Sequence, residues 1–439
     1  MRASPKTRLF LPQMLLFIAL VGISIQCEHK VEMDQVESRR TSSLDLDSTL
    51  AGEWLRQGLA QLDTANYDQA LIYLNRADTV FQKLAVDSQD SILLSRYLVT
   101  TNNRATALSR MSQTDSALSI INQAITWGRT HFPSGNLETA KSLYIKGSIF
   151  LDKARYGEAA GWYQQGLEAF DRMGYGQSLD AAICGSFLGL VTSYRDLDKG
   201  YEQITDAVNL AATIKDTLDP RVADIYHLYA SVVQRKNGAA EALPYFERAL
   251  NLKLHHYGPN HLSVSRTYNN MAIAYFFLGN YEKSLELQKI NQVIREQLSP
   301  VPHRYLSSTY LNIGIIYERL QEYDEALKYY EQAYQHTLES VGQDHLQSLR
   351  ISYAMIIILK NKGQDQQAIR IAKGNRDSFG ETLNEDLGLA ASHYDVLGSI
   401  YLKLRVLDSA FYYTDLALEA KISYYGKDSY PVAASYDHM

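Results

Sequence analysis

The amino-acid sequence predicts an all-α fold, an α-solenoid (superhelix) of about nine helix pairs followed by a truncated tenth. Two observations predict it. A short phrase built around one small residue recurs along the chain at a nearly constant interval. Around that residue, further small and large apolar side chains recur at offsets that suit one face of a helix. The anchor residues of the phrase are Ala70, Ala117, Ala159, Gly200, Ala242, Ser284, Ala326, Ala368 and Ala410.

The composition is typical of a folded, soluble chain and argues against several classes of function. Of the 439 residues, 46% are apolar and 21% are charged. The net charge of −6, without a clustered stripe of Lys and Arg, argues against binding to nucleic acid. The two cysteines, Cys27 and Cys184, form neither a disulfide framework nor a metal site of known spacing.

The N-terminus predicts an export signal at residues 1–26. Basic residues precede an apolar run from Leu9 to Ile25, which is the order of a secretory signal peptide. The polar residues 27–48 that follow suit a flexible tether between a membrane and a folded domain. We therefore expect an exported protein, periplasmic or anchored at an outer membrane.

Cys27 directly follows the apolar run and resembles the acylated cysteine of bacterial lipoproteins. This resemblance implies lipidation at Cys27 and a membrane contact through the N-terminus. Gln26 stands where the lipoprotein signal has a small residue. Ordinary cleavage and an uncleaved anchor therefore remain as alternatives.

The recurring phrase extends from residue 49 to residue 439 and predicts a repeat array. From Ala117 onward the anchors are 41 or 42 residues apart, and only the first interval, from Ala70, is 47. Small residues recur twelve positions before and seven positions after the anchor, and large apolar residues recur sixteen before it. Small residues at such offsets let two helix backbones approach closely. Each unit therefore reads as a packed helical hairpin.

The best-matched unit resembles the tetratricopeptide repeat. The 42-residue period, with the phrase YGPNHLSVSRTYNNMAIAYFFLGNYEKSLEL at 257–287, is similar to the kinesin-light-chain type of this repeat. Repeats of that type occur in bacterial exported proteins and ahead of CHAT domains. The residues that carry the resemblance are Tyr310, Ile313, Gly314, Tyr317, Ala326 and Tyr330, and again Tyr394, Leu397, Gly398, Tyr401 and Ala410.

This resemblance implies a non-enzymatic scaffold that binds a peptide or a partner helix in a concave groove. In the family, the residue two positions before the small residue of the first helix points into the groove. Asparagine amides at this position are suited to hydrogen-bond the backbone of an extended peptide. The asparagines concerned are Asn103, Asn270 and Asn312, and the neighbours expected on the same face are His227, Arg235, Arg266, Asn269, Phe276 and Arg319.

Catalytic and metal-binding motifs are missing from the sequence. It contains no nucleophile elbow, phosphate-binding loop or HExxH helix. His261, His303 and His345 are 42 residues apart, so they occupy equivalent positions of successive repeats, about 10 Å from one another, and cannot converge on one ion. We expect no enzymatic activity, no cofactor, no metal and no small-molecule substrate.

A tenth unit begins near Gly426, and Met439 comes before its small residue and its second helix. We therefore expect an array that is incomplete at the C-terminus. The alternative function is the recognition half of a larger protein, whose CHAT-type peptidase or signalling effector domain would lie beyond residue 439. A glycan-binding outer-membrane lipoprotein fits less well, because such proteins are irregular.

Overall fold

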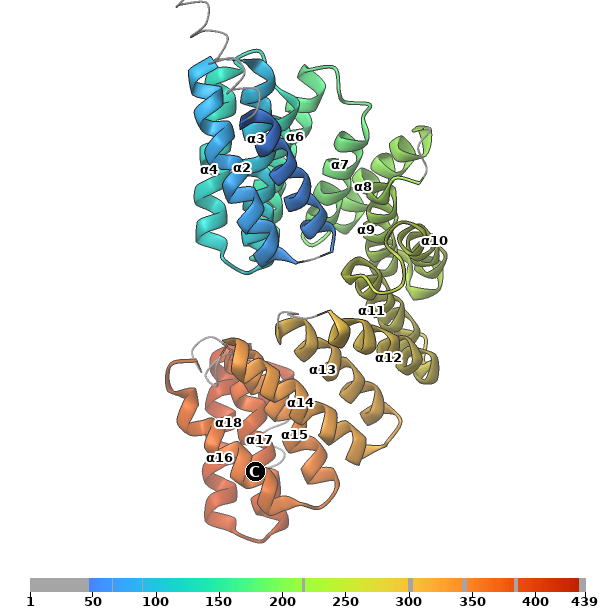
Figure 1. The fold of residues 1–439 in the computed structure, drawn as a ribbon. Helices are drawn as coiled ribbons and strands as arrows, with labels where there is room; N and C mark the ends of the chain where they lie inside the picture. The colour runs from blue at the N-terminus through green and yellow to red at the C-terminus, as the bar shows by residue number, and fades with distance from the viewer. Residues whose placement is uncertain are drawn as a thin grey trace, which may run out of the picture. The chain divides into compact units, whose positions relative to one another are not determined.

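The computed structural model describes residues 47–64, 66–88, 90–214, 218–298, 303–341, 346–382 and 386–433. These ranges contain helices joined by turns and no strand, which confirms the all-α prediction (Figure 1). The predicted signal peptide and Cys27 lie outside the described residues. Among the described helices, none combines the length and the apolar character needed to span a bilayer.

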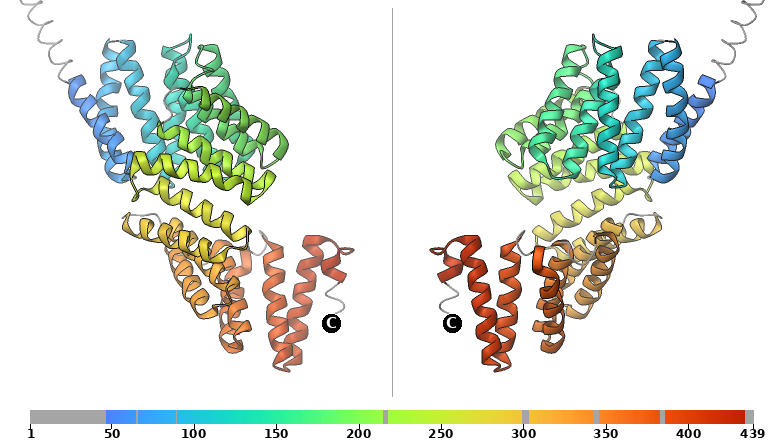
Figure 2. Two further views of the ribbon diagram at one scale, coloured as in Figure 1. Left: turned by 90° about the vertical axis from the view of Figure 1, so that its right-hand side faces the viewer. Right: turned by 90° about the vertical axis from the view of Figure 1, so that its left-hand side faces the viewer.

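The helices follow one another as hairpins, and consecutive helices pack on each other from α2 to α4 and from α6 to α18 (Figure 2). Nine pairs lie within the described residues, and a further helical turn at 430–433 follows them. They are a helix at 47–63, α2 (Tyr67–Ser88), α3 (Ser91–Arg110), α4 (Thr114–His131), α5 (Leu137–Asp152), α6 (Tyr156–Arg172), α7 (Leu179–Thr192), α8 (Leu197–Thr213), α9 (Pro220–Asn237), α10 (Ala239–Tyr257), α11 (Leu262–Phe277), α12 (Tyr281–Gln297), α13 (His303–Arg319), α14 (Tyr323–Val341), α15 (Leu346–Asn361), α16 (Asp365–Thr382), α17 (Leu387–Lys403) and α18 (Leu407–Tyr425).

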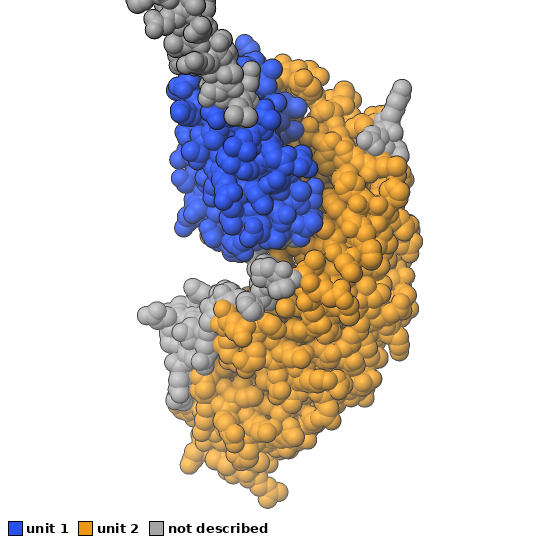
Figure 3. All heavy atoms as spheres, in the orientation of Figure 1, with its two compact units in different colours: residues 1–149 blue, residues 150–439 orange. Residues whose placement is uncertain are grey.

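The chain divides into two compact units, residues 1–149 and 150–439 (Figure 3). The boundary falls inside α5, between Ile149 and Phe150. In the second unit, first helices of successive pairs also contact each other, as α7 does α9 and α9 does α11. Such nearest-neighbour packing is what a repeat array needs, because one hairpin cannot bury its apolar face alone.

The anchor residues predicted from the sequence are the points where paired helices approach most closely. Each anchor is the fourth residue of the second helix of its pair, and each is buried. At Gly200 on α8, an added Cβ would lie 2.6 Å from the carbonyl oxygen of Gly189 on α7. Ser284 is larger and polar, and its Oγ donates to the carbonyl of Ala272 at 2.7 Å. The column therefore accepts only a side chain that is small or that bonds to the facing helix.

Some of the turns between pairs hold a polar side chain that begins the next helix. Asp386 does so, because its carboxylate accepts from the backbone N–H of Leu389 at the start of α17. At α11 the capping side chain is His261, whose Nδ1 accepts from the backbone N–H of Ser263. This histidine therefore has a structural role at the start of the helix. The side chains of His303 and His345 lie outside the described ones.

We predict that Gly200→Ala lowers the free energy of unfolding by about 2 kcal/mol or more, because the methyl group collides with backbone atoms of α7. Gly161 is an exposed residue of α6, and an added Cβ there meets nothing within 4 Å. Gly161→Ala should therefore raise the free energy of unfolding by up to about 1 kcal/mol. Chemical denaturation of both variants measures the two changes. Equal effects would contradict the close-approach argument.

Candidate functional site

Several predicted groove residues form one chain of hydrogen bonds across α9, α11 and α13. It begins at His227 on α9, whose Nε2 lies 3.1 Å from Nδ2 of Asn270 and whose Nδ1 lies 3.2 Å from Oγ1 of Thr267. Asn269 then donates to Oδ1 of Asn270 at 3.1 Å. Asn312 donates to Oδ1 of Asn269 at 3.0 Å. We call His227, Asn270, Asn269 and Asn312 the amide ladder.

Helix α12, which pairs with α11, supports the ladder from one side. Gln288 on α12 donates to Oδ1 of Asn269 at 3.1 Å and accepts from Asn291 at 2.9 Å. Gln288 and Asn291 are almost completely buried, whereas the ladder residues are half-buried. Buried amides that satisfy one another hold fixed orientations. The ladder is therefore a rigid row of polar groups with part of its surface exposed.

The hydrogen bonds require a neutral imidazole at His227. The Nδ2 of Asn270 is a donor, so Nε2 of His227 must be the acceptor, and the ring proton is left on Nδ1 facing Thr267. Burial, and after it the positive charges of Lys253 and Arg266, lowers the pKa of His227 well below its usual range. The electrostatics and the hydrogen bonds thus favour the same protonation state.

An ion pair with one buried partner lies beside the ladder. The ammonium of Lys253 on α10, only 1% exposed, is 2.9 Å from the carboxylate of Asp224 on α9. Burial alone would raise the pKa of Asp224, but the charges of Lys253 and Arg266 more than offset it and hold this pKa below its usual range. Burial lowers the pKa of Lys253. Each partner therefore depends on the other to stay charged.

One repeat further on, the same two positions carry two positive charges. Arg266 is 42 residues after Asp224, and Arg295 is 42 residues after Lys253. No ion pair joins either arginine to a carboxylate in the part of the chain that the structure describes. We call Arg266 and Arg295 the arginine pair.

Neutral oxygens satisfy the buried member of the arginine pair. The guanidinium of Arg295 donates to Oγ of Ser265 at 2.9 Å, to Oγ1 of Thr309 at 2.7 Å and to the carbonyl of Tyr305 at 2.6 Å. Burial, with a contribution from Arg266, lowers the pKa of Arg295 to about 10. Arg266 is half-buried and donates no hydrogen bond to any described residue. Positive charge thus exceeds negative charge beside the ladder, because Asp224 is the carboxylate that acts on both Lys253 and Arg266.

The remaining predicted groove residues lie outside the ladder. Arg235 donates to the carbonyl and to Oγ of Ser193, both at 2.7 Å, and covers the ring of Tyr194. Arg319 lies 5.9 Å from the ring centre of Phe276. Asn103 belongs to the first unit, on α3, where its amide donates to the carbonyl of Val99 at 2.8 Å. These contacts are local, and a role in partner binding stays a prediction for all nine residues.

Sequence reasoning missed Asp224, Lys253, Gln288 and Arg295. A signal for part of this set was present, because Asn291 occupies the column that Ala249 and Ala333 fill in neighbouring repeats. A polar residue in a buried column requires polar partners nearby. Nothing in the described residues gathers three or more metal-ligating side chains.

The chain is similar to a known repeat family and to several solved structures. A family model described as tetratricopeptide repeat matches residues 221–289 and 305–373. A solved structure of a STAND signal-transduction ATPase with a tetratricopeptide repeat sensor, from Pyrococcus horikoshii, is 14% identical with a TM-score of 0.59, and the match covers 84% of this chain and 54% of that one. A Rap protein complexed with competence and sporulation factor is 13% identical with a TM-score of 0.52, and the match covers 86% and 98%.

A third solved structure contains the nearly identical repeats of a putative kinesin light chain from Podosopora anserina. It is 16% identical with a TM-score of 0.42, and the match covers 47% of this chain and 97% of that one. A comparison with curated protein sequences found no match.

We predict that the protein loses stability as the pH falls from about 6.5 to about 4. In the unfolded chain a histidine titrates near 6.5, whereas burial lowers the pKa of His227 and lowers that of His393 to about 4. The unfolded state therefore binds more protons in this window, and each group contributes a slope of up to about 1.4 kcal/mol per pH unit. Thermal melts across the window measure the slope.

Two variants and a control test the assignment of this slope. His227→Asn and His393→Asn should each flatten the pH dependence, whereas His255→Asn on the exposed end of α10 should leave it unchanged. If both His227→Asn and His393→Asn keep the wild-type dependence of stability on pH, other groups cause it.

Proposed function

We propose that this chain, in which residues 221–289 and 305–373 match the tetratricopeptide-repeat model, is an exported scaffold whose predicted groove binds an acidic peptide segment along the amide ladder. Tetratricopeptide repeats form extended surfaces for contacts between proteins, and the chain has that scaffold fold. The peptide, its charge and its position on α9, α11 and α13 are the proposal. No chemical step is involved.

The amide ladder supports binding to an extended backbone. An asparagine amide has two N–H groups and an oxygen with two lone pairs, and each bond within the ladder occupies only one of these sites. A second donor or acceptor on each amide suits the alternating C=O and N–H groups of a peptide. Because the ladder is already ordered by its own bonds, little side-chain entropy is lost when a peptide binds.

The arginine pair carries the proposal that the peptide is acidic. In the preceding repeat the equivalent positions hold an ion pair, Asp224 with Lys253, so their two charges cancel. At Arg266 and Arg295 the acidic partner is missing from the described residues. A carboxylate of the bound peptide would pair with Arg266, the half-buried member, because guanidinium groups form strong charge-assisted bonds with carboxylates.

We predict that Asn270→Ala and Asn312→Ala each lower the affinity for the peptide roughly fivefold to tenfold, because each removes about one hydrogen bond. Arg266→Gln should weaken it at least tenfold and make binding less sensitive to salt, because a charge pair is lost. The partner is first found by co-purification with residues 28–439, and titration calorimetry then measures affinity. Gln165→Ala, on the exposed face of α6, is the matched control. Unaltered affinity in all three groove variants would refute the proposal.

Export and anchoring rest on the N-terminal sequence. Cys27→Ser should abolish incorporation of labelled palmitate in a bacterial host and release the protein from the membrane fraction, because the cysteine thiol is the acylation site of lipoproteins. Cys184→Ser is the control, since Cys184 is buried and its thiol donates to the carbonyl of Tyr163. A wild-type protein that stays in the membrane fraction without taking up the label would favour an uncleaved anchor.

A further inference from the structure

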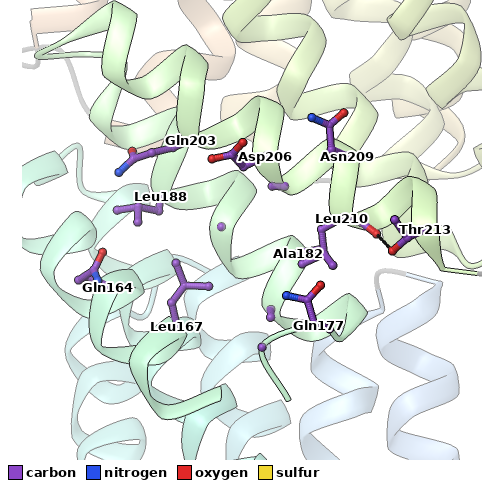
Figure 4. A pocket seen from close by; sticks show the side chains of 14 residues that line it. Gln164, Leu167, Gln177, Ala182, Leu188, Gln203, Asp206, Asn209, Leu210 and Thr213 are labelled. Atoms are coloured by element: carbon purple, nitrogen blue, oxygen red, sulfur yellow. Dashed lines mark hydrogen bonds between the residues drawn. The ribbon is translucent and has the colours of Figure 1, made fainter. Parts of the chain in front are cut away.

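A hollow of about 570 Å³ opens between α6, α7 and α8, away from the amide ladder (Figure 4). In the view of Figure 4, side chains of α8 line its upper side, and Gln164 and Leu167 of α6 lie opposite. Its lining residues are Gln164, Leu167, Gly176, Gln177, Ala181, Ala182, Gly185, Leu188, Gln203, Asp206, Ala207, Asn209, Leu210 and Thr213.

The hollow has an apolar floor and a polar rim. The floor consists of Ala181, Ala182, Leu188 and Ala207, all less than one-tenth exposed. The rim residues, in contrast, are exposed: Gln164, Gln177, Asp206, Asn209 and Thr213. This distribution, and a volume within the range of about 300–1,000 Å³ for small-ligand pockets, suits one small organic molecule.

Comparison among the repeats shows why this hollow occurs at α7. Ala182 and Gly185 have larger counterparts at intervals of 42 residues along the chain. An added Cβ at Gly185 would lie 3.5 Å from that of Ala207, which is ordinary contact, so close packing does not require a glycine here. The space therefore comes from small side chains at positions that other repeats fill. The counterparts are Asp224 and His227, Arg266 and Asn269, Ser308 and Leu311, and Arg350 and Tyr353.

The polar groups of the hollow select for hydrogen-bond donors and positive charge. Asp206 is the one charged residue of the lining, which contains no Lys, Arg or His. The Oε1 of Gln203 is buried and accepts no hydrogen bond from any described residue. A buried acceptor without a partner is unfavourable unless a ligand or water donates to it. A carboxylate or phosphate ligand would meet Asp206 without any compensating cation.

We propose that this pocket binds a small organic amine, with its apolar body on the alanine and leucine floor and its ammonium group between Asp206 and the Gln203 carbonyl. The ammonium offers three N–H donors, enough for both acceptors and for one rim amide. This site is independent of the proposed peptide groove, because none of its residues belongs to the amide ladder or to the arginine pair. The sequence predicts a peptide or helix partner and a membrane contact but no small-molecule substrate, so this ligand goes beyond those expectations.

Three probes with the same apolar body test the charge selection: 4-phenylbutylamine, 4-phenylbutanol and 4-phenylbutyrate. Titration calorimetry on the full chain should show the amine binding at least tenfold more tightly than the alcohol, and no binding of the carboxylate. Asp206→Asn should reduce the affinity for the amine to that for the alcohol. Equal binding of all three probes, or no binding of the amine, would overturn the proposal.

A filled pocket provides the second test. Gly185→Leu should abolish binding of 4-phenylbutylamine, and Leu311 at the equivalent position shows that the fold accepts leucine there. Circular dichroism checks that the variant is folded. Asp408→Asn, which removes an exposed carboxylate on α18, should bind the amine as the wild type does. Unchanged amine affinity in folded Gly185→Leu would place the ligand elsewhere and refute the site. Peptide binding measured on the same variant reports separately on the groove.

Discussion

The close approach of the two helices in each pair is the constraint on which the rest of the structure depends. A small residue at the fourth position of every second helix lets the backbones meet, as Gly200 does against Gly189. The large side chains between these points, such as Tyr163, Phe246 and Tyr330, are then completely buried. Because pairs such as α7/α8, α11/α12 and α13/α14 repeat this contact, the array is held by many similar interfaces rather than by one central core.

Polar residues in these buried positions must find partners in the neighbouring helix, and this requirement generates the candidate site. Asn291 occupies a column that alanine fills elsewhere, and it bonds to Gln288 and to Ser265. Gln288 in turn holds Asn269, a member of the amide ladder. The cost of burying an unsatisfied amide thus fixes the orientation of the half-buried groups of the amide ladder. The rigidity of the proposed groove follows from packing and needs no ligand.

The architecture could be predicted from the sequence because the small residues recur at a nearly constant interval. Helix geometry then determines which side chains of each helix face its neighbour. The period placed all nine described pairs, with the anchors buried as expected. The site was only partly predictable. A motif indicates which side chains share a face, so His227, Asn270 and Asn312 were identified, but it does not indicate which of them bond to one another. Lys253 looks like a surface residue until the tertiary structure places it 2.9 Å from Asp224. The hollow at Gly185 depends on the volumes of three neighbouring helices, which a single helix does not reveal.

The positions that pack the helices together are distinct from the positions that carry polar or charged groups. Repeats with the same fold can therefore differ in chemistry. The columns are occupied by small residues in successive pairs, so exchanges elsewhere leave the hairpin intact. Asp224 and Lys253 form a neutral pair in one repeat, and Arg266 and Arg295 replace both in the next. Gly185, which has no side chain, occupies the position that His227 and Asn269 hold in the next two repeats. One scaffold position is thus part of a hydrogen-bonded ladder in one repeat and an open hollow in another. A repeat array can therefore carry two unlike binding surfaces without a change of fold.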